Sequence, residues 1–108
     1  MYLQTGANMK NIDKSEFESA VKSNVNVIVQ FSADWCGPCK RLTPILENFA
    51  DARDDVTAFK VDISEQSDLA TQYNVMSIPK LVFFKNGNQS NEKIGLVNEG
   101  KLAELIGE

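Results

Sequence analysis

Residues 27–40 read VIVQFSADWCGPCK, and they join two segments of different character. Apart from Gln30, the first part is apolar and rich in β-branched residues, which is typical of a strand buried on both faces. Cys36 and Cys39 follow, and an amphipathic helical pattern begins at about Pro38. The sequence therefore predicts a buried strand that leads directly into a helix, with two cysteines at the junction.

Outward from this junction, strand patterns and helix patterns alternate along the chain. We expect strands over residues 25–31, 56–61, 80–85 and 89–94, and helices over residues 38–53, 67–73 and from Asn98 onward. A further helix near residues 15–21 would begin with Ser15 and Glu18, which fit the capping-box pattern, and Asn86-Gly87 is a hairpin signal. The predicted fold class is α/β, a single three-layer domain with a mixed central β-sheet flanked by helices on both faces.

The composition describes a small acidic domain with few reactive groups. The chain has 108 residues, with 11 Lys and Arg, 15 Asp and Glu, two cysteines and no histidine. This length suits one domain, which we place at residues 9–108, with residues 1–8 as an N-terminal extension or an edge strand. The lack of histidine excludes a Ser-His-Asp or Cys-His nucleophile pair and any zinc site that needs an imidazole.

Charge and hydropathy exclude two further classes of partner. A formal net charge of −4 provides no basic surface for nucleic acid or for an anionic membrane. No stretch approaches the roughly 20 apolar residues of a membrane-spanning helix, and residues 1–10 do not read as a secretory signal. We therefore expect a cytoplasmic protein, in which a cysteine pair is more often catalytic than structural. An exported protein whose signal has been removed would show the same features.

Cys36 and Cys39 are the residues that carry chemistry. Two cysteines at this spacing at the start of a helix lie close enough to form a small disulfide ring. Cys36 would lie where free amides and the helix dipole stabilise a thiolate, and Cys39, one turn further in, would be more buried. Gly37 allows a tight turn, and Pro38 suits the first turn of a helix. The pair indicates redox chemistry without a metal or bound cofactor; the alternatives are half of an intermolecular zinc site and two unreactive core cysteines.

Four separate motifs resemble those of the thioredoxin family and extend over nearly the whole chain. They are residues 27–40, Met76-Ser77-Ile78-Pro79, Phe83-Phe84-Lys85-Asn86-Gly87 and Ile94-Gly95. The resemblance implies the thioredoxin fold and a dithiol-disulfide oxidoreductase, and Gly37-Pro38 is similar to the ring of the family's general protein-disulfide reductases. Cys36 would then attack a substrate disulfide and Cys39 would resolve the mixed disulfide. The implied partners are disulfide-containing proteins and a thioredoxin reductase as electron donor, and we expect a monomer.

The resemblance also implies a substrate-binding surface beside the cysteines. In the family, the proline that matches Pro79 is cis and faces the cysteine pair, and the backbone at the position of Ile78 pairs with an extended substrate. Trp35 and Gly95, with Gly37-Pro38, would complete a flat apolar rim. A proline before a strand is also common without any function, and Ile78 suits a core position equally well.

The chain departs from the family at positions near the cysteines. Gln30 stands where the family usually has a buried Asp, which is thought to accept the proton of the resolving thiol, and a glutamine cannot serve as that base. The matching lysine remains as Lys60, which without its acidic partner should either favour its neutral form or reach toward water. We hypothesise slower resolution by Cys39 and a more stable fold than in a Gln30→Asp variant; the alternative is a neutral replacement. Lys80 follows Pro79 where Thr is usual, and either adds positive charge near the substrate groove or extends to water.

Two other functions remain open at this point. The chain could be a binding or regulatory subunit with the thioredoxin fold, in which the redox pair is incidental. It could also be a disulfide isomerase or oxidase, which would require a less reducing potential than a reductase has. The intact cysteine pair argues against the binding subunit, and the reduction potential would separate a reductase from an isomerase or oxidase.

Overall fold

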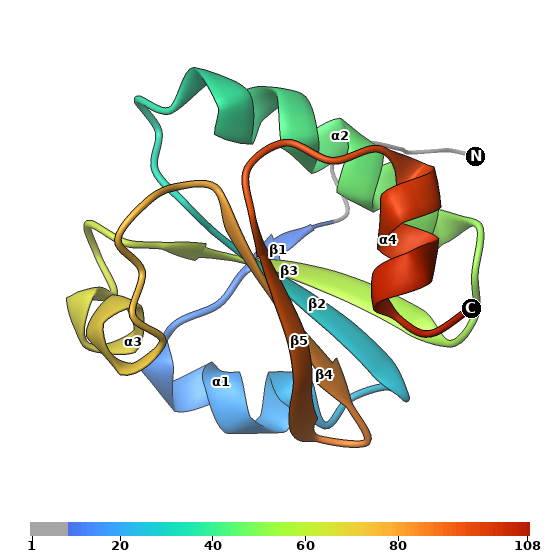
Figure 1. Cartoon of the computed structure of the whole chain (residues 1–108). Helices are drawn as coiled ribbons and strands as arrows, with labels where there is room; N and C mark the ends of the chain where they lie inside the picture. Colours follow the sequence, from blue (N-terminus) through green and yellow to red (C-terminus); the bar gives the residue numbers. More distant parts are fainter. Residues whose placement is uncertain (1–8) are drawn as a thin grey trace, which may run out of the picture.

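The computed structural model describes residues 9–108, in which one mixed β-sheet lies between two layers of helices (Figure 1). The elements in chain order are β1 (Lys10–Asn11), α1 (Lys14–Val21), β2 (Asn26–Ser32), α2 (Gly37–Asp51), β3 (Val56–Asp62), α3 (Ser67–Gln72), β4 (Lys80–Lys85), β5 (Asn88–Ile94) and α4 (Glu99–Leu105). The prediction about residues 1–8 lies outside the described residues. Within residues 9–108, no helix combines the length and the apolar character needed to cross a membrane.

The sheet has the strand order β1-β3-β2-β4-β5. β1 and β2 both pair with β3 in parallel, whereas β4 runs antiparallel to β2, and β5 runs antiparallel to β4. β2 is the central strand and is buried along residues 26–31, which explains its nearly continuous apolar sequence. The predicted mixed sheet and the predicted elements are confirmed, with their ends shifted by at most about two residues.

Helices cover both faces of the sheet, and alternate residues of β2 enter opposite layers. Ile28 joins a core cluster with Leu42 on the face covered by α2 and α4. Val29 joins a second cluster with Phe17 on the face covered by α1 and α3. Gln30 follows Val29 and therefore points to the same face as Ile28. This parity places Gln30 beneath the helix that carries the cysteines.

The turn between β4 and β5 is the predicted Asn86-Gly87 hairpin. Both residues have positive φ, 54° at Asn86 and 84° at Gly87, as a two-residue turn matched to the twist of the strands requires. A Cβ atom on Gly87 would also lie 3.0 Å from Cγ of Lys22, so both the positive φ and the close contact favour glycine at this position. The hairpin returns β5 along β4 until Ile94 lies opposite Lys80.

The N-terminus of α1 differs from the prediction. Asp13 is the N-cap residue: its side chain accepts from the Glu16 amide at 2.9 Å, and the Glu16 side chain accepts from the Asp13 amide at 3.0 Å. The predicted box of Ser15 and Glu18 is therefore wrong by two residues. Asp13 and Glu16 have the same spacing as Ser15 and Glu18, and an Asp side chain accepts a hydrogen bond from a backbone amide as well as a Ser side chain does. Both pairs therefore fit the capping-box pattern. The Ser15 hydroxyl donates to Asp13 at 2.7 Å instead.

The capping box should make part of the stability sensitive to acid. The pKa of Asp13 is lowered by hydrogen bonds from the Ser15 hydroxyl and the Glu16 amide, and the pKa of Glu16 is lowered chiefly by its hydrogen bond with Lys10. Groups whose folded pKa is lowered contribute stability above their unfolded pKa of about 4 and lose it as the pH falls through the folded value.

An Asp13→Asn variant keeps an acceptor for the cap but cannot titrate. Its urea midpoint should therefore fall less than that of the wild type between about pH 5 and about pH 2. An Asp13→Ala variant serves as the control, because it removes the acceptor and should have a lower midpoint at every pH above this range. Equal acid losses in Asp13→Asn and the wild type would contradict the prediction.

Candidate active site

Three loops meet at one end of the sheet, where β2 and β5 finish and β4 begins. Phe31 pairs with Lys80, and Lys80 in turn pairs with Ile94. The start of α2, the loop before β4 and the loop after β5 accordingly lie together toward the upper left of Figure 1. These loops carry the cysteines, Pro79 and Gly95, and the Gly95 amide donates to the Pro79 carbonyl at 2.9 Å. The fold thus gathers the predicted motifs, which are distant in sequence.

Cys36 and Cys39 form a disulfide at the N-terminus of α2, with their Cα atoms 5.3 Å apart. Cys36 is the N-cap residue, and its Sγ accepts a hydrogen bond from the Cys39 amide at 3.2 Å. Pro38 lies in the first turn, and Cys39 is only 2% exposed. An amide of the helix end is thus directed at the Cys36 sulfur, which favours negative charge there once the disulfide is reduced.

Gln30 lies beneath this turn and is fully buried. Its Nε2 donates to the Cys39 carbonyl at 3.0 Å. The Thr43 hydroxyl lies within hydrogen-bond distance of Oε1 of Gln30, at 3.1 Å, and of the Cys39 carbonyl, at 3.0 Å. The sequence does not single out Thr43, although its spacing of four residues from Cys39 puts it on the same helix face. Gln30 and Thr43 therefore tie the central strand to the backbone of the second cysteine.

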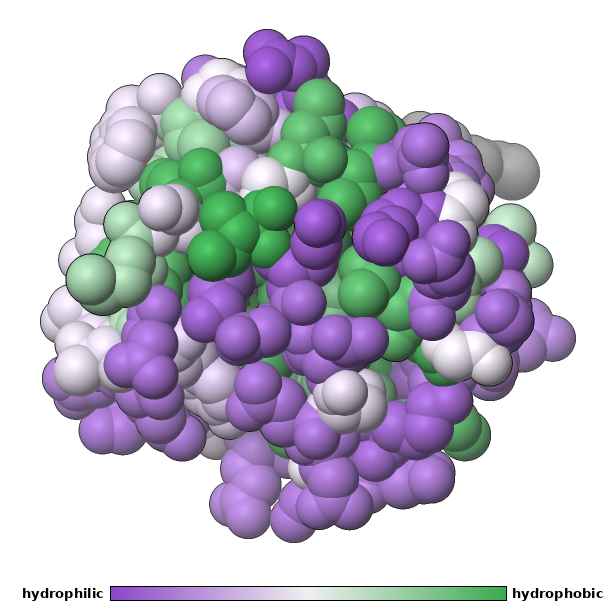
Figure 2. All heavy atoms as spheres, viewed as in Figure 1, coloured by the Kyte–Doolittle hydropathy of each residue, from purple (hydrophilic) through white to green (hydrophobic). Residues whose placement is uncertain are grey.

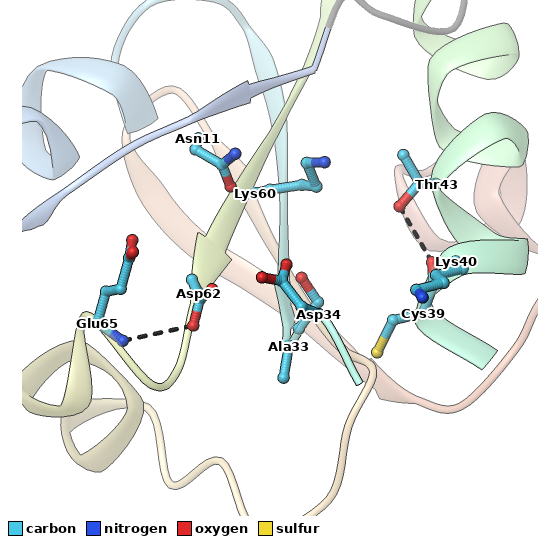
Figure 3. Close-up of a pocket in the computed structure, with 10 residues that line it drawn as sticks. Asn11, Ala33, Asp34, Cys39, Lys40, Thr43, Lys60, Asp62 and Glu65 are labelled. Carbon is cyan, nitrogen blue, oxygen red and sulfur yellow. Dashed lines mark hydrogen bonds between the residues drawn. The ribbon is translucent and has the colours of Figure 1, made fainter. Parts of the chain in front are cut away.

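Lys60 lines a pocket of about 390 Å³ beside Cys39. It pairs with Gln30 across β2 and β3, and its side chain is half-buried. The pocket has mostly polar walls (Figure 3), and among the residues drawn there are Cys39, Lys40 and Thr43 from α2, Lys60 and Asp62 from β3, and Asp34 and Glu65 from loops. Lys60 thus shares its pocket with carboxylate residues even though position 30 has none. The position of the usual acidic partner is filled by the Gln30 amide, as the sequence predicts.

Large apolar side chains are exposed around the three loops. Trp35 is 73% exposed and Met76 is 90% exposed, and Ile94 and Leu96 are about half exposed. Figure 2 shows apolar and neutral residues gathered over this end of the molecule, above a mostly hydrophilic lower half. An exposed apolar patch of this kind marks an interaction surface. Of these residues only Trp35 is predicted from the sequence, because residues in loops or at the end of a strand, such as Ile94, have no periodicity that reveals their exposure.

The other predicted rim residues differ in burial. The Ile78-Pro79 bond is cis, as the resemblance implies. Pro79 is buried and Ile78 is half-buried, whereas Gly37-Pro38 is exposed. Gly95 has a φ of 97°, a left-handed conformation that glycine adopts without strain. The predicted rim therefore lies at the three loops, with Pro79 below its surface.

Lys80 does not extend to water, which is one of the two alternatives that the sequence leaves open. The residue is 4% exposed, and its Nζ donates to the Tyr73 carbonyl at 2.7 Å and pairs with Glu92 at 3.1 Å. Strand alternation explains the difference, since Lys80 shares a face of β4 with Val82, which packs in the layer of α1 and α3. The ammonium group therefore lies inside the protein, between β5 and the end of α3.

A cysteine pair that can close into a disulfide at a helix end can exchange that bond with other disulfides, because one sulfur is stabilised as the attacking thiolate. On this α/β sheet, with a cis proline and an exposed apolar rim in the adjoining loops, such a pair defines the class of dithiol-disulfide oxidoreductases.

Comparison with known proteins narrows the class to a family. The family model for thioredoxin matches residues 8–108. Thioredoxins from Mycoplasmoides gallisepticum and Chlamydia pneumoniae are 38% and 45% identical to this chain over 91% of its length, and the matches cover 99% and 95% of those proteins. The solved structure of a mutant thioredoxin from Halobacterium salinarum matches with a TM-score of 0.84 at 34% identity, over 98% of this chain and 93% of that chain. The chain belongs to the thioredoxin family and is a thiol-disulfide oxidoreductase.

Proposed function

We propose that the chain is a general protein-disulfide reductase. The observation that carries the proposal is Cys36 at the N-cap of α2 with an amide on its sulfur, while Cys39 lies one turn deeper. In the reduced protein, the Cys36 thiolate attacks a substrate disulfide, forms a mixed disulfide and releases one substrate thiolate. Cys39 then loses its proton and attacks Cys36 Sγ, which forms the Cys36–Cys39 disulfide and releases the second substrate thiolate. Two electrons have passed from the protein to the substrate.

The oxidised protein must be reduced before the next turnover. Because the chain belongs to the thioredoxin family, we propose that a thioredoxin reductase is its electron donor and that disulfide-containing proteins are its substrates. The reaction requires no metal or bound cofactor, since both electrons reside on Cys36 and Cys39. A reductant of this kind works where thiols are kept reduced, so we propose that the protein acts in the cytoplasm. We also propose that it acts as a monomer.

We propose that substrates lie against Trp35, Ile78, Pro79 and Gly95. The exposure of Trp35 supports this assignment, because a large aromatic side chain outside the core is suited to contact with a partner. The hydrogen bond from the Gly95 amide to the Pro79 carbonyl holds two of the loops together. An extended segment of substrate around a disulfide could then pair with the backbone of Ile78.

We propose that Gln30 slows the second step of the reaction. Its amide is engaged with the Cys39 carbonyl and cannot take a proton near neutral pH. The proton of Cys39 then leaves to water, for which the polar pocket beside Cys39 offers room. Gln30 should also make the fold more stable than an Asp at this position would, because a neutral, hydrogen-bonded side chain at a fully buried position avoids the cost of a buried carboxylate. In the competing explanation glutamine is a neutral replacement without effect on the rate.

Reduction of insulin by dithiothreitol tests the proposed activity. The wild-type chain should accelerate the reaction, and a Cys36→Ser variant should not. Equilibration with glutathione should give a reduction potential of about −270 mV, whereas a value above about −200 mV would indicate an isomerase or oxidase. If the folded wild-type protein does not accelerate insulin reduction, the binding or regulatory subunit becomes the better explanation. A Cys36→Ser variant would then keep the biological effect of the protein.

A further inference from the structure

Lys80 is a buried cation that the disulfide-exchange reaction does not use. We propose that Lys80 is a positioning residue for protein substrates, because it holds the loop of residues 74–79 in which Met76, Ile78 and Pro79 lie. This inference rests on the proposed reductase function and adds the residue that shapes one side of the substrate surface.

The ammonium group of Lys80 has three hydrogens and three acceptors within reach. Nζ lies 2.7 Å from the Tyr73 carbonyl oxygen, 3.5 Å from the Asn74 carbonyl oxygen and 3.1 Å from Oε1 of Glu92. The side chain of Lys80 is 5% exposed and that of Glu92 is 57% exposed. Because hydrogen bonds from a charged donor are stronger than neutral ones and Glu92 supplies the opposite charge, the buried ammonium is well held.

These contacts join the two ends of the loop. Tyr73 and Asn74 come directly after α3, whereas Lys80 is the first residue of β4, so the lysine side chain bridges the segment between them. The Tyr73 end is itself anchored, because its ring packs against three aromatic rings with centroids 5.4 to 6.0 Å away, those of Phe17, Phe31 and Phe84. The lysine therefore connects β4 to a point of the chain that is held by the core.

The part of the loop that faces solvent lies between these anchors. At the β4 end, the Pro79 carbonyl accepts from the Gly95 amide at 2.9 Å. Met76, which is 90% exposed, and Ile78, which is half-buried, are thus presented by a segment whose two ends are tied to the interior. Removing the Lys80 side chain would release the β4 end of the loop from the Tyr73 end, which the aromatic rings still hold, and would leave the disulfide and α2 in place.

Protein substrates and small disulfides should respond differently to this release. A protein must contact the loop as well as the cysteines, and a loop that is less ordered before binding adds an entropic cost to the complex. A small disulfide needs only to reach Cys36. The loss of Lys80 should therefore raise KM for a protein disulfide while kcat, the reduction potential and the reaction with a small disulfide stay unchanged.

Lys80→Met tests this inference, with Lys85→Met as the matched control. Lys85 lies at the opposite end of β4, and its Nζ donates to the Ile106 carbonyl at 2.8 Å, so the control removes a similar lysine-carbonyl contact away from the active-site loops. We expect Lys80→Met to raise KM for insulin about tenfold with kcat within about twofold of the wild type, and Lys85→Met to leave both within about twofold. Urea unfolding of both variants shows whether they lose similar stability.

An unchanged KM in folded Lys80→Met protein would overturn the proposal, as would an equal rise in KM in Lys85→Met. Equal slowing with a small aromatic disulfide would also overturn it, because the effect would then lie at the cysteines. If Lys80→Met does not fold, Lys80→Thr takes its place with the same expected and contrary results, since its smaller side chain leaves room for water at the freed carbonyls. A wild-type protein that fails to reduce insulin would instead contradict the proposed function.

Discussion

A Cys39→Ser variant is expected to stop after one half-reaction, with the substrate protein left attached to Cys36. Cys36 keeps its place at the N-cap of α2 and can still attack a disulfide. The second attack is lost with the Cys39 thiol. In the wild type the two Cα atoms are 5.3 Å apart, a usual separation for a disulfide, so Cys39 can reach Cys36 without movement of the backbone. An intramolecular attack of this kind has a very high effective concentration, so insulin turnover should fall at least about a hundredfold.

The measurement is the stoichiometry of the trapped species. Wild type, Cys39→Ser and Cys36→Ser are reduced, freed of reductant and mixed with a disulfide-containing protein, and the products are separated without reducing agent. Cys39→Ser should give a mixed disulfide in a one-to-one ratio, and Cys36→Ser should give none. Wild-type turnover by Cys39→Ser would contradict the assignment of Cys39 as the resolving thiol. A mixed disulfide formed by Cys36→Ser would contradict the assignment of Cys36 as the nucleophile.

A Gln30→Asp variant is expected to resolve the mixed disulfide faster and to be less stable at neutral pH. The new carboxylate would supply a base beneath Cys39, where Gln30 offers only a donor to the Cys39 carbonyl. It would also lie at a fully buried position, lose that donation and stand close to a carbonyl oxygen. We expect the free energy of unfolding to fall by roughly 2–4 kcal/mol at pH 7.

The dependence on pH separates the charge from the change of shape. Burial should raise the pKa of the new carboxyl, so its folded form holds a proton over a pH range in which its unfolded form does not. The loss of stability should therefore be small below about pH 4 and should grow as the pH rises toward the raised folded pKa. Gln30→Asn is the matched control, because it has the same shorter side chain without a charge and should lose stability almost equally at all pH values.

Urea unfolding across this pH range and insulin turnover at pH 7 are the two measurements. A Gln30→Asp variant that is no faster and no less stable than the wild type would remove the proposed role of Gln30. Glutamine would then be a neutral replacement. A variant that is less stable but no faster would leave the stability argument in place and show that the polar pocket beside Cys39 already removes the proton fast enough.

Local patterns predicted much of the fold and of the site. The pattern of apolar residues locates the strands and helices, and the spacing of Cys36 and Cys39 places a reactive pair at a helix end. The N-terminus of α1 shows the limit of such patterns, because Asp13 with Glu16 and Ser15 with Glu18 have the same spacing. The choice between them depends on where β1 ends and α1 begins, and a spacing rule does not contain that information.

Side-chain direction was harder to predict than position. The sequence marks Lys80 as an unusual residue beside Pro79, but the face of β4 that it occupies depends on the exact start of the strand, and a shift of one residue reverses the face. The sequence does not reveal the role of Thr43, because that role depends on the distance between α2 and β2, which brings its hydroxyl to Gln30. Both contacts join segments that are remote in the chain.

The sequence by itself determined that this protein has an α/β sheet with a redox-active cysteine pair at the start of a helix, because spacing and periodicity act within a few residues. It also determined that no histidine is present to act as a base, and that position 30 carries an amide. Only the tertiary structure decided where these groups act: Gln30 on the Cys39 carbonyl, and Lys80 on the carbonyl of Tyr73. The physical reason is that a buried polar group must find its partners inside the fold, and those partners are set by how strands and helices pack.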